Sequence, residues 1–261
     1  MTKQLLIPAL LLVACSKEIK KTNMETKLDR NLHHFNFRTA FMSGMYEGEF
    51  TMEQLLQKGD FGLGTFNNLE GEMIVLGGKI YRATADGNAS EVNDPAVKTP
   101  SAMVTFFRPG REVDMINLTR EKLEEWIAKN LDIQKRMYAI RITGSFDSLK
   151  TRSQHPVYEK PFPGINDIID NMVYHNREET QGTLVGFQLP PYLEGINYPG
   201  LHFHFISDTG SGSASVGGCA PGFHIQKAKL SIMELTSFSV DVPRNQDFYE
   251  LKLDREKSKH M

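Results

Sequence analysis

Apolar positions recur with a helical period in only a few segments of this chain. Thr51 and Gln54 have the spacing of a capping box before an apolar run, and Gly59 is placed to end the helix that this predicts. The strongest helical period lies in NLTREKLEEWIAKNL, where Asn117 or Thr119 can provide the N-cap. The apolar positions of that helix are Leu123, Trp126, Ile127 and Leu131. Their spacing predicts a helix with one face packed on a core.

Short apolar runs and period-two alternation predict strands elsewhere. Met73–Leu76 and Lys79–Arg82 flank the two-residue turn Gly77-Gly78, which indicates a hairpin. A further short helix is expected over Pro163–Met172, after a break at residues 154–161. The other predicted strands lie in MYAIRITGSF, GTLVGFQLP, LHFHFISDTG and AKLSIMELTSFSV.

Two histidines lie two residues apart in the apolar stretch LHFHFISDTG. Alternate side chains of a strand share a face, so His202 and His204 point the same way, with Leu201, Phe203 and Phe205 on the other face. Two imidazoles on one face provide two thirds of a zinc site, although a hydrogen-bonded histidine pair has the same spacing. The Gly- and Ser-rich stretch SDTGSGSASVGGCAPG that overlaps and follows is expected to be a mobile loop.

Helices and strands are mixed without regular βαβ alternation, which favours an α+β fold with mixed and antiparallel sheets and a few helices. The 261 residues allow one large domain or two small ones, with ample length for a core. The net charge is −2 and the basic residues are scattered, so nucleic acid is not an expected partner. The chain holds only two cysteines, which do not form a disulfide framework.

The N-terminus has the pattern of a cleavable lipoprotein signal. Lys3 precedes an apolar segment, Leu5–Ala14, which is too short to span a membrane, and Cys15 closes a lipobox-like LVAC. Residues 1–27 are therefore interpreted as a signal and tether, with the mature protein anchored through Cys15 in the bacterial cell envelope or outside the cell. The alternative is a cytoplasmic protein with a buried N-terminal element.

Three segments together resemble one enzyme family. They are GTFNNLEGEMIVLGGKIYR, YAIRITGSF and GTLVGFQLPPYLEGINYPGLHFHFISD, and the similarity runs from about Phe50 to about Phe248. This combination resembles α-acetolactate decarboxylase. The resemblance implies a two-domain α+β enzyme, with a mixed-sheet domain over 28–150 and an antiparallel-sheet domain over 151–261 that carries the metal site. It also implies that the enzyme uses Zn²⁺, held by three histidines, to convert (S)-2-acetolactate into (R)-acetoin and CO2. The partner it implies is a small 2-hydroxy-3-oxo acid.

The resemblance also assigns residues to the site. His202 and His204 match two of the metal ligands, Thr65 and Glu72 match polar site positions, and Arg141 matches the arginine of an Ile-Arg-Ile strand. Glu72 suits the acid that protonates the product, and Arg141 suits a fork of donors for the carboxylate. The family also brings a carboxylate from near the C-terminus, for which the candidates are Glu250, Asp254 and Glu256.

The third metal ligand departs from the family pattern. Counting back from AKLSI puts Cys219 where the third histidine is expected, in a loop four residues longer than usual. Three outcomes are open: Cys219 binds zinc as a thiolate, His224 takes its place, or no third protein ligand exists. We favour Cys219.

Two other functions are compatible with the sequence. One is a paralogue that has lost its metal and acts as a binding or inactive protein. The altered Gly-Gly-Cys segment supports this alternative. A zinc hydrolase that uses metal-bound water is the other, although no His-Glu-x-x-His or Ser-His-Asp signature supports it. The oligomeric state stays open, a homodimer included.

Overall fold

A computed structural model describes residues 30–208 and 215–253 of the chain. Cys15, Asp254 and Glu256, which the sequence singles out, lie outside the described residues. Within the described ranges no helix is both long and apolar enough to cross a membrane.

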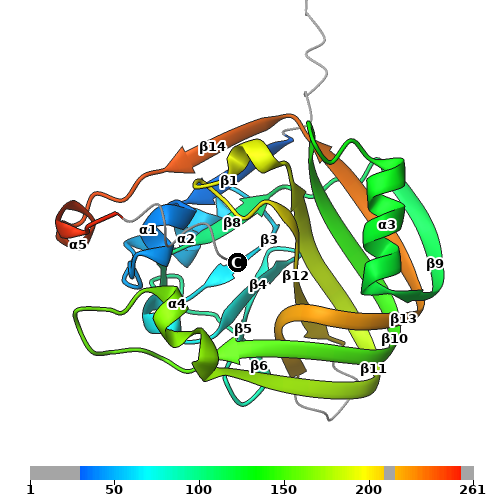
Figure 1. The fold of residues 1–261 in the computed structure, drawn as a ribbon, viewed down its shortest axis with the longest axis horizontal. Coiled ribbons are helices and arrows are strands. Elements are labelled where there is room, and N and C mark those ends of the chain that lie inside the picture. The colour runs from blue at the N-terminus through cyan, green and yellow to red at the C-terminus, as the bar shows by residue number, and fades with distance from the viewer. Residues whose placement is uncertain (1–29, 209–214, 254–261) are drawn as a thin grey trace, which may run out of the picture.

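The N-terminal strands form one curved antiparallel sheet, in the order β6-β5-β4-β3-β8-β1. At its end β1 pairs in parallel with β14 (Figure 1). β2 and β7 form a small separate sheet. The strands are β1 (Asn31–Phe35), β2 (Phe50–Thr51), β3 (Phe61–Thr65), β4 (Glu72–Leu76), β5 (Lys79–Ala83), β6 (Asn88–Glu91), β7 (Lys98–Thr99) and β8 (Ala102–Thr105). The helices of this part are α1 (Arg38–Met42), α2 (Met52–Leu56) and the 3-10 turn η1 (Asn67–Leu69).

The C-terminal strands are longer and close on themselves. β10, β11, β12 and β13 pair in sequence, and β13 also pairs with β10, so the four strands form a barrel; β9 adds to β13. The elements are β9 (Arg111–Thr119), α3 (Arg120–Asn130), β10 (Met137–Gln154), α4 (Ile165–Ile168), η2 (Ile169–Asn171), β11 (Met172–Leu189), η3 (Pro191–Leu193), β12 (Gly200–Ser207), β13 (Ser215–Leu235), β14 (Ser237–Asp241) and α5 (Gln246–Glu250). Leu123 and Ile127 pack α3 onto the core of the barrel.

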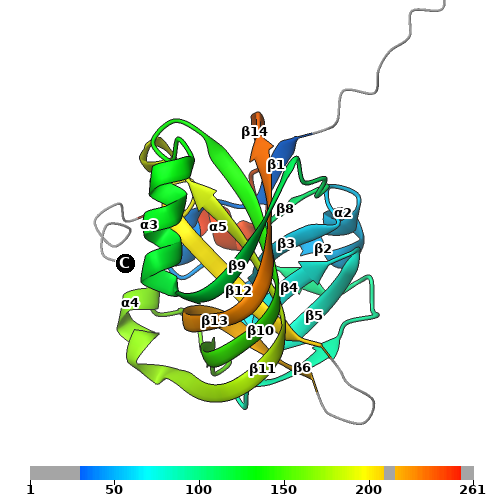
Figure 2. The ribbon, with the colours of Figure 1, turned by 90° about the vertical axis from the view of Figure 1, so that its right-hand side faces the viewer.

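The barrel and the N-terminal sheet meet face to face and also share hydrogen bonds. A second core fills the space between them, with Leu63 and Ile74 from the sheet and Val185 and Phe187 from the barrel. Figure 2 shows the barrel strands and the strands of the N-terminal sheet beside one another. The start of β13 pairs with β6, which joins all these strands into one twelve-stranded sheet. The predicted division between residues 150 and 151 falls inside β10, and the division into two domains stays a prediction.

The α+β class is confirmed, as are most of the predicted elements. Helix α2 begins with the capping box of Thr51 and Gln54, and Gly77 and Gly78 make the β4–β5 turn with φ of 60° and 77°, a conformation that glycine adopts without strain. Helix α3 is capped by Thr119, not by Asn117.

Two expectations need correction. The helix expected over 163–172 is only α4 followed by the 3-10 turn η2, because β11 already begins at Met172. Part of the predicted mobile loop is strand: β13 begins at Ser215, and Cys219 lies within it. Position 218 requires glycine for a structural reason. Its φ is +139°, and a Cβ there would lie 2.7 Å from the Arg152 carbonyl oxygen. Glycine at this position permits two strands to approach closely.

Candidate active site

His202 and His204 lie on the face of β12 that looks away from the barrel core, as the alternation predicts. Phe203 and Phe205 fill that core, while the histidines face the N-terminal sheet. The Nδ1 atom of His204 lies 2.8 Å from the carbonyl oxygen of Met73 on β4. Because a carbonyl oxygen only accepts, Nδ1 carries the hydrogen, and Nε2 keeps the lone pair that a metal ion needs.

Cys219 completes a triangle of donor atoms with the two histidines. It is the cross-strand neighbour of His204, and its Sγ lies 3.6 Å from His202 Nε2. Each residue offers a donor atom, and the three lie within 4.8 Å of one another. Typical Zn–S and Zn–N bonds of about 2.3 and 2.0 Å at a tetrahedral angle place sulfur and nitrogen about 3.5 Å apart. The buried Nδ1 of His202 has no hydrogen-bond partner. The donor set therefore fits zinc, with both nitrogen and sulfur ligands.

His224, the alternative third ligand, does not reach this cluster. It lies further along β13, where Nε2 is 2.8 Å from Asn117 Oδ1 and Nδ1 is 3.4 Å from Asp147 Oδ2. Since β13 is extended, five residues carry His224 far along the strand from Cys219. Among the described residues, the structure thus brings Cys219, and not His224, to the two histidines.

Burial and charge set the protonation states of the cluster. Burial, with the charges of Arg152 and Arg120, lowers the pKa of His202 to about 4. Burial alone would raise the pKa of the Cys219 thiol. His204 and Arg152 more than offset this effect and bring the pKa below its usual value, to about 7. At neutral pH His202 is thus neutral, and the thiolate of Cys219 is readily formed, as metal binding requires.

Glu72 and Thr65 lie beside the cluster, as the resemblance implied. They face each other across the β3–β4 hairpin, and Glu72 Oε2 lies 3.4 Å from His204 Nε2. Burial, and second the charge of Cys219, raise the pKa of Glu72 well above its usual value, which Arg152 only partly offsets. Thr65 donates its hydroxyl hydrogen to the Gly71 carbonyl oxygen, 2.9 Å away. Glu72 is therefore a carboxyl group that keeps its proton to higher pH than an ordinary glutamate does.

Arg152 lines the cavity, whereas the predicted Arg141 does not. Arg141 lies on β10 with its guanidinium 5.2 Å from the centre of the Phe107 ring and is absent from the cavity wall. Arg152, near the end of the same strand, is the direct neighbour of Cys219 and lines the cavity. Burial alone would lower the pKa of Arg152, but interactions with Cys219, and to a smaller extent with Tyr174 and Glu72, hold it above the usual value. The sequence analysis missed this residue.

The described residues provide no C-terminal carboxylate for the cavity. Glu250 lies exposed on α5, away from the cavity wall, and the two other candidates lie outside the described residues.

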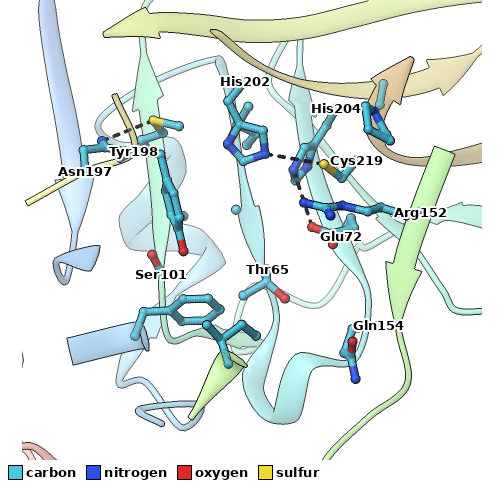
Figure 3. A pocket seen from close by; sticks show the side chains of 18 of the residues that line it. Thr65, Glu72, Ser101, Arg152, Gln154, Asn197, Tyr198, His202, His204 and Cys219 are labelled. Atoms are coloured by element: carbon cyan, nitrogen blue, oxygen red, sulfur yellow. Dashed lines mark hydrogen bonds and ion pairs between the residues drawn. The ribbon is translucent and has the colours of Figure 1, made fainter. Parts of the chain in front are cut away.

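One cavity of about 420 Å³ lies between the barrel and the N-terminal sheet (Figure 3). Its wall includes His202, His204, Cys219, Glu72, Thr65 and Arg152. Its polar end holds the metal-ligand cluster with Glu72 and Arg152, and Thr65, Ser101 and Gln154 continue the polar surface. The apolar part of the wall is formed by Phe41, Leu63, Leu69, Met103, Ile165 and Met172. Such a cavity suits a small acid with an apolar substituent.

The family profile described as Alpha-acetolactate decarboxylase matches residues 32–255 of the chain. This chain belongs to that family. A Klebsiella aerogenes protein named "Alpha-acetolactate decarboxylase" is 33% identical over 226 residues, which cover 86% of this chain and 85% of that protein. A Methanosarcina mazei protein of the same name is 35% identical over 217 residues, 82% of this chain and 73% of the relative.

Solved structures of family members share the fold. The crystal structure of alpha-acetolactate decarboxylase from Bacillus subtilis strain 168 superposes with a TM-score of 0.80 at 32% identity, over 86% of this chain and 94% of that one. A Staphylococcus aureus protein described as of unknown function and similar to the family superposes with a TM-score of 0.81 at 25% identity, over 87% and 96% of the two chains.

Proposed function

We propose that this member of the family is a zinc enzyme that converts (S)-2-acetolactate into (R)-acetoin and CO2. The observation that carries the proposal is the triangle of His202, His204 and Cys219 beside a half-buried acid, Glu72, and a half-buried cation, Arg152, in one cavity. The names of the relatives support the same substrate. Zinc is the proposed metal because a mixed imidazole and thiolate donor set suits it.

The reaction breaks the bond between C2 and the carboxylate carbon. The electron pair of that bond stays on C2 and is delocalised onto the neighbouring ketone oxygen, and a proton then forms the new C–H bond. A bound zinc ion supplies a Lewis acid that stabilises this negative charge as it develops.

The chain itself binds the substrate and supplies the proton. The guanidinium of Arg152 can donate two hydrogen bonds to the substrate carboxylate and orient it. Because its pKa is raised, Glu72 is the group that carries a proton beside the substrate and delivers it to C2 after CO2 has left. Delivery from one side only gives a single acetoin enantiomer. Water in the cavity would weaken each of these electrostatic contacts. The apolar part of the wall limits how much water surrounds them.

The proposal is tested on purified protein by measuring bound metal together with acetoin formed from 2-acetolactate. We expect about one zinc ion per chain and the (R) enantiomer. Tight zinc without acetoin would favour a different zinc enzyme. Neither zinc nor acetoin would leave the inactive or binding paralogue as the function.

The role of Cys219 gives the first prediction. Cys219→Ala should weaken zinc binding by at least about tenfold, because one of three protein ligands is lost. Replacing zinc by Co²⁺ should produce a thiolate-to-metal absorption band in the wild-type protein and none in Cys219→Ala. The matched control is His224→Ala on the same strand, which should keep both the affinity and the band. A loss of zinc in His224→Ala alone would contradict the assignment.

A second prediction separates the two arginines of β10. Arg152→Lys keeps the charge but removes the two-pronged donor, so kcat/KM for 2-acetolactate should fall by about a hundredfold. Arg141→Lys should stay within about threefold of the wild type, because its contact is with Phe107 outside the cavity. Equal losses in both variants would show that Arg152 has no special role in the reaction.

We also propose that Cys15 is lipidated and anchors the protein in the cell envelope. In a bacterium with lipoprotein processing, Cys15→Ala or globomycin treatment should leave an unprocessed, larger chain and abolish fatty-acid labelling. The expected fraction for the wild type is the membrane. A full-length, unlabelled wild-type chain in the cytosol would refute this proposal.

A further inference from the structure

Tyr198 lies beside the metal-ligand cluster and has no part in the chemistry proposed above. It belongs to the segment between η3 and β12, and its ring centre lies 5.9 Å from that of His202, edge to face. It lines the cavity. Figure 3 shows it on one side of His202, with Glu72 and Arg152 on the other. The ring therefore forms the part of the cavity wall next to His202.

The position of Tyr198 is fixed through its backbone. Its N–H donates to the Asn197 side-chain oxygen at 2.7 Å, and Asn197 is itself fully buried against Met103. Two residues before Tyr198, the carbonyl oxygen of Ile196 accepts a hydrogen bond of 2.8 Å from the backbone N–H of Arg38 at the start of α1. The segment is thus attached to two elements of the N-terminal sheet region.

Arg38 also contacts the ring with its charge. Its guanidinium carbon lies 4.7 Å from the centre of the Tyr198 ring, and the side chain is buried, with 3% of the residue exposed. Its Nε atom has no hydrogen-bond partner, and across residues 30–208 and 215–253 no carboxylate forms an ion pair with it. Burying a cation without an acid is costly, so the ring face is the partner that holds it there.

The hydroxyl group of Tyr198 is poorly suited to chemistry. It donates to the thioether sulfur of Met42 at 3.4 Å, a weak acceptor. Burial, only partly offset by Arg38, raises the pKa of Tyr198 to about 12, so the phenol stays neutral. What Tyr198 presents to the cavity is the volume of a rigid ring.

We propose that Tyr198 determines which substituent at C2 of a 2-hydroxy-3-oxo acid the site accepts, and that Arg38 is its positioning residue. The inference rests on the proposed function for the identity of the acid. The ring limits the space for the C2 substituent, so that an acid with a methyl group there binds more tightly than one with a propyl group. Removing the ring opens space next to His202, while removing only its hydroxyl leaves the wall in place.

The test is binding of unreactive analogues to the zinc-loaded protein by calorimetry. The probes are 2,3-dihydroxy-2-methylbutanoate and its 2-propyl homologue, which lack the ketone and cannot lose CO2 in the same way. Tyr198→Ala should shift the ratio of affinities by at least about tenfold towards the propyl compound, the size of effect expected when a pocket gains room for methylene groups. Tyr198→Phe should keep the wild-type ratio. The control is Tyr192→Ala, which should keep the wild-type ratio because Tyr192 is an exposed tyrosine of η3 that is not part of the cavity wall.

Arg38 is tested by the same ratio. Arg38→Met removes the charge at similar length and should move the ratio in the same direction as Tyr198→Ala, while Arg38→Lys should restore part of the discrimination. Zinc content and circular dichroism identify any variant that fails to fold. An unchanged ratio in folded, zinc-loaded Tyr198→Ala would overturn the role of Tyr198, and one in Arg38→Met would overturn that of Arg38.

A parallel assay compares kcat/KM for 2-acetolactate and its 2-propyl homologue. If the analogues bind with the expected ratios but neither substrate is decarboxylated, the proposed function fails and the steric role of Tyr198 stands. If the wild-type protein binds neither analogue, the inference is overturned as well.

Discussion

The protein with both His202→Ala and His204→Ala is expected to bind no zinc, whereas the wild type binds about one ion per chain. The two imidazoles supply two of three protein ligands, and Cys219 alone cannot hold the ion against water. Acetoin formation should fall to background in the same protein. Metal analysis after dialysis, with the acetoin assay, measures both effects.

The matched control is His155→Ala, which removes an exposed imidazole outside the cavity wall. It should retain full zinc content and activity. Full zinc occupancy in the double variant would mean that the metal binds elsewhere, and the site assignment would have to be abandoned.

Glu72→Gln is expected to lower kcat by about a hundred- to a thousandfold while zinc stays bound. Glutamine keeps the size and a hydrogen-bonding oxygen but cannot deliver a proton to C2, and positioned general acids contribute on that scale. The pH profile follows from the raised pKa of Glu72. The protonated form is the active one, so wild-type turnover should fall as pH rises through that pKa, and Glu72→Gln should lack this alkaline limb.

Glu70→Gln provides the control for this variant. Glu70 lies two residues earlier, pairs with Arg82 and does not line the cavity. Its removal should leave turnover within about threefold of the wild type, since a partly exposed ion pair contributes little. Equal losses in the two variants would indicate damage to the hairpin instead of loss of an acid.

Local sequence patterns predicted those features of the fold and the site that are set by residues close together in the chain. The capping box of Thr51, the glycine turn after β4 and the common face of His202 and His204 all follow from periods of two to four residues. Cys219 was favoured from its distance to AKLSI, and the structure brings it to the two histidines because its strand pairs with theirs.

The choice of arginine could not be made from such patterns. Arg141 and Arg152 share one strand, and simple alternation would place residues eleven apart on opposite faces. Strand β10 has register shifts against β13 between Ser145 and Ser148 and again between Lys150 and Arg152. Each bulge changes the alternation, and no local signal in the sequence marks where it occurs. The cavity face of β10 therefore becomes known only from the pairing.

The hydrogen bond between His204 and Met73 joins residues that are 131 positions apart. Chains whose contacts join such distant residues fold slowly, because a long loop must close before the contact forms. The three metal ligands lie within eighteen residues of one another and can meet once β12 and β13 pair, but the tautomer that suits His204 for zinc is selected only when β4 arrives. During refolding, zinc should therefore bind weakly at first and tightly only after the slowest step, so that added zinc raises the final stability without accelerating folding.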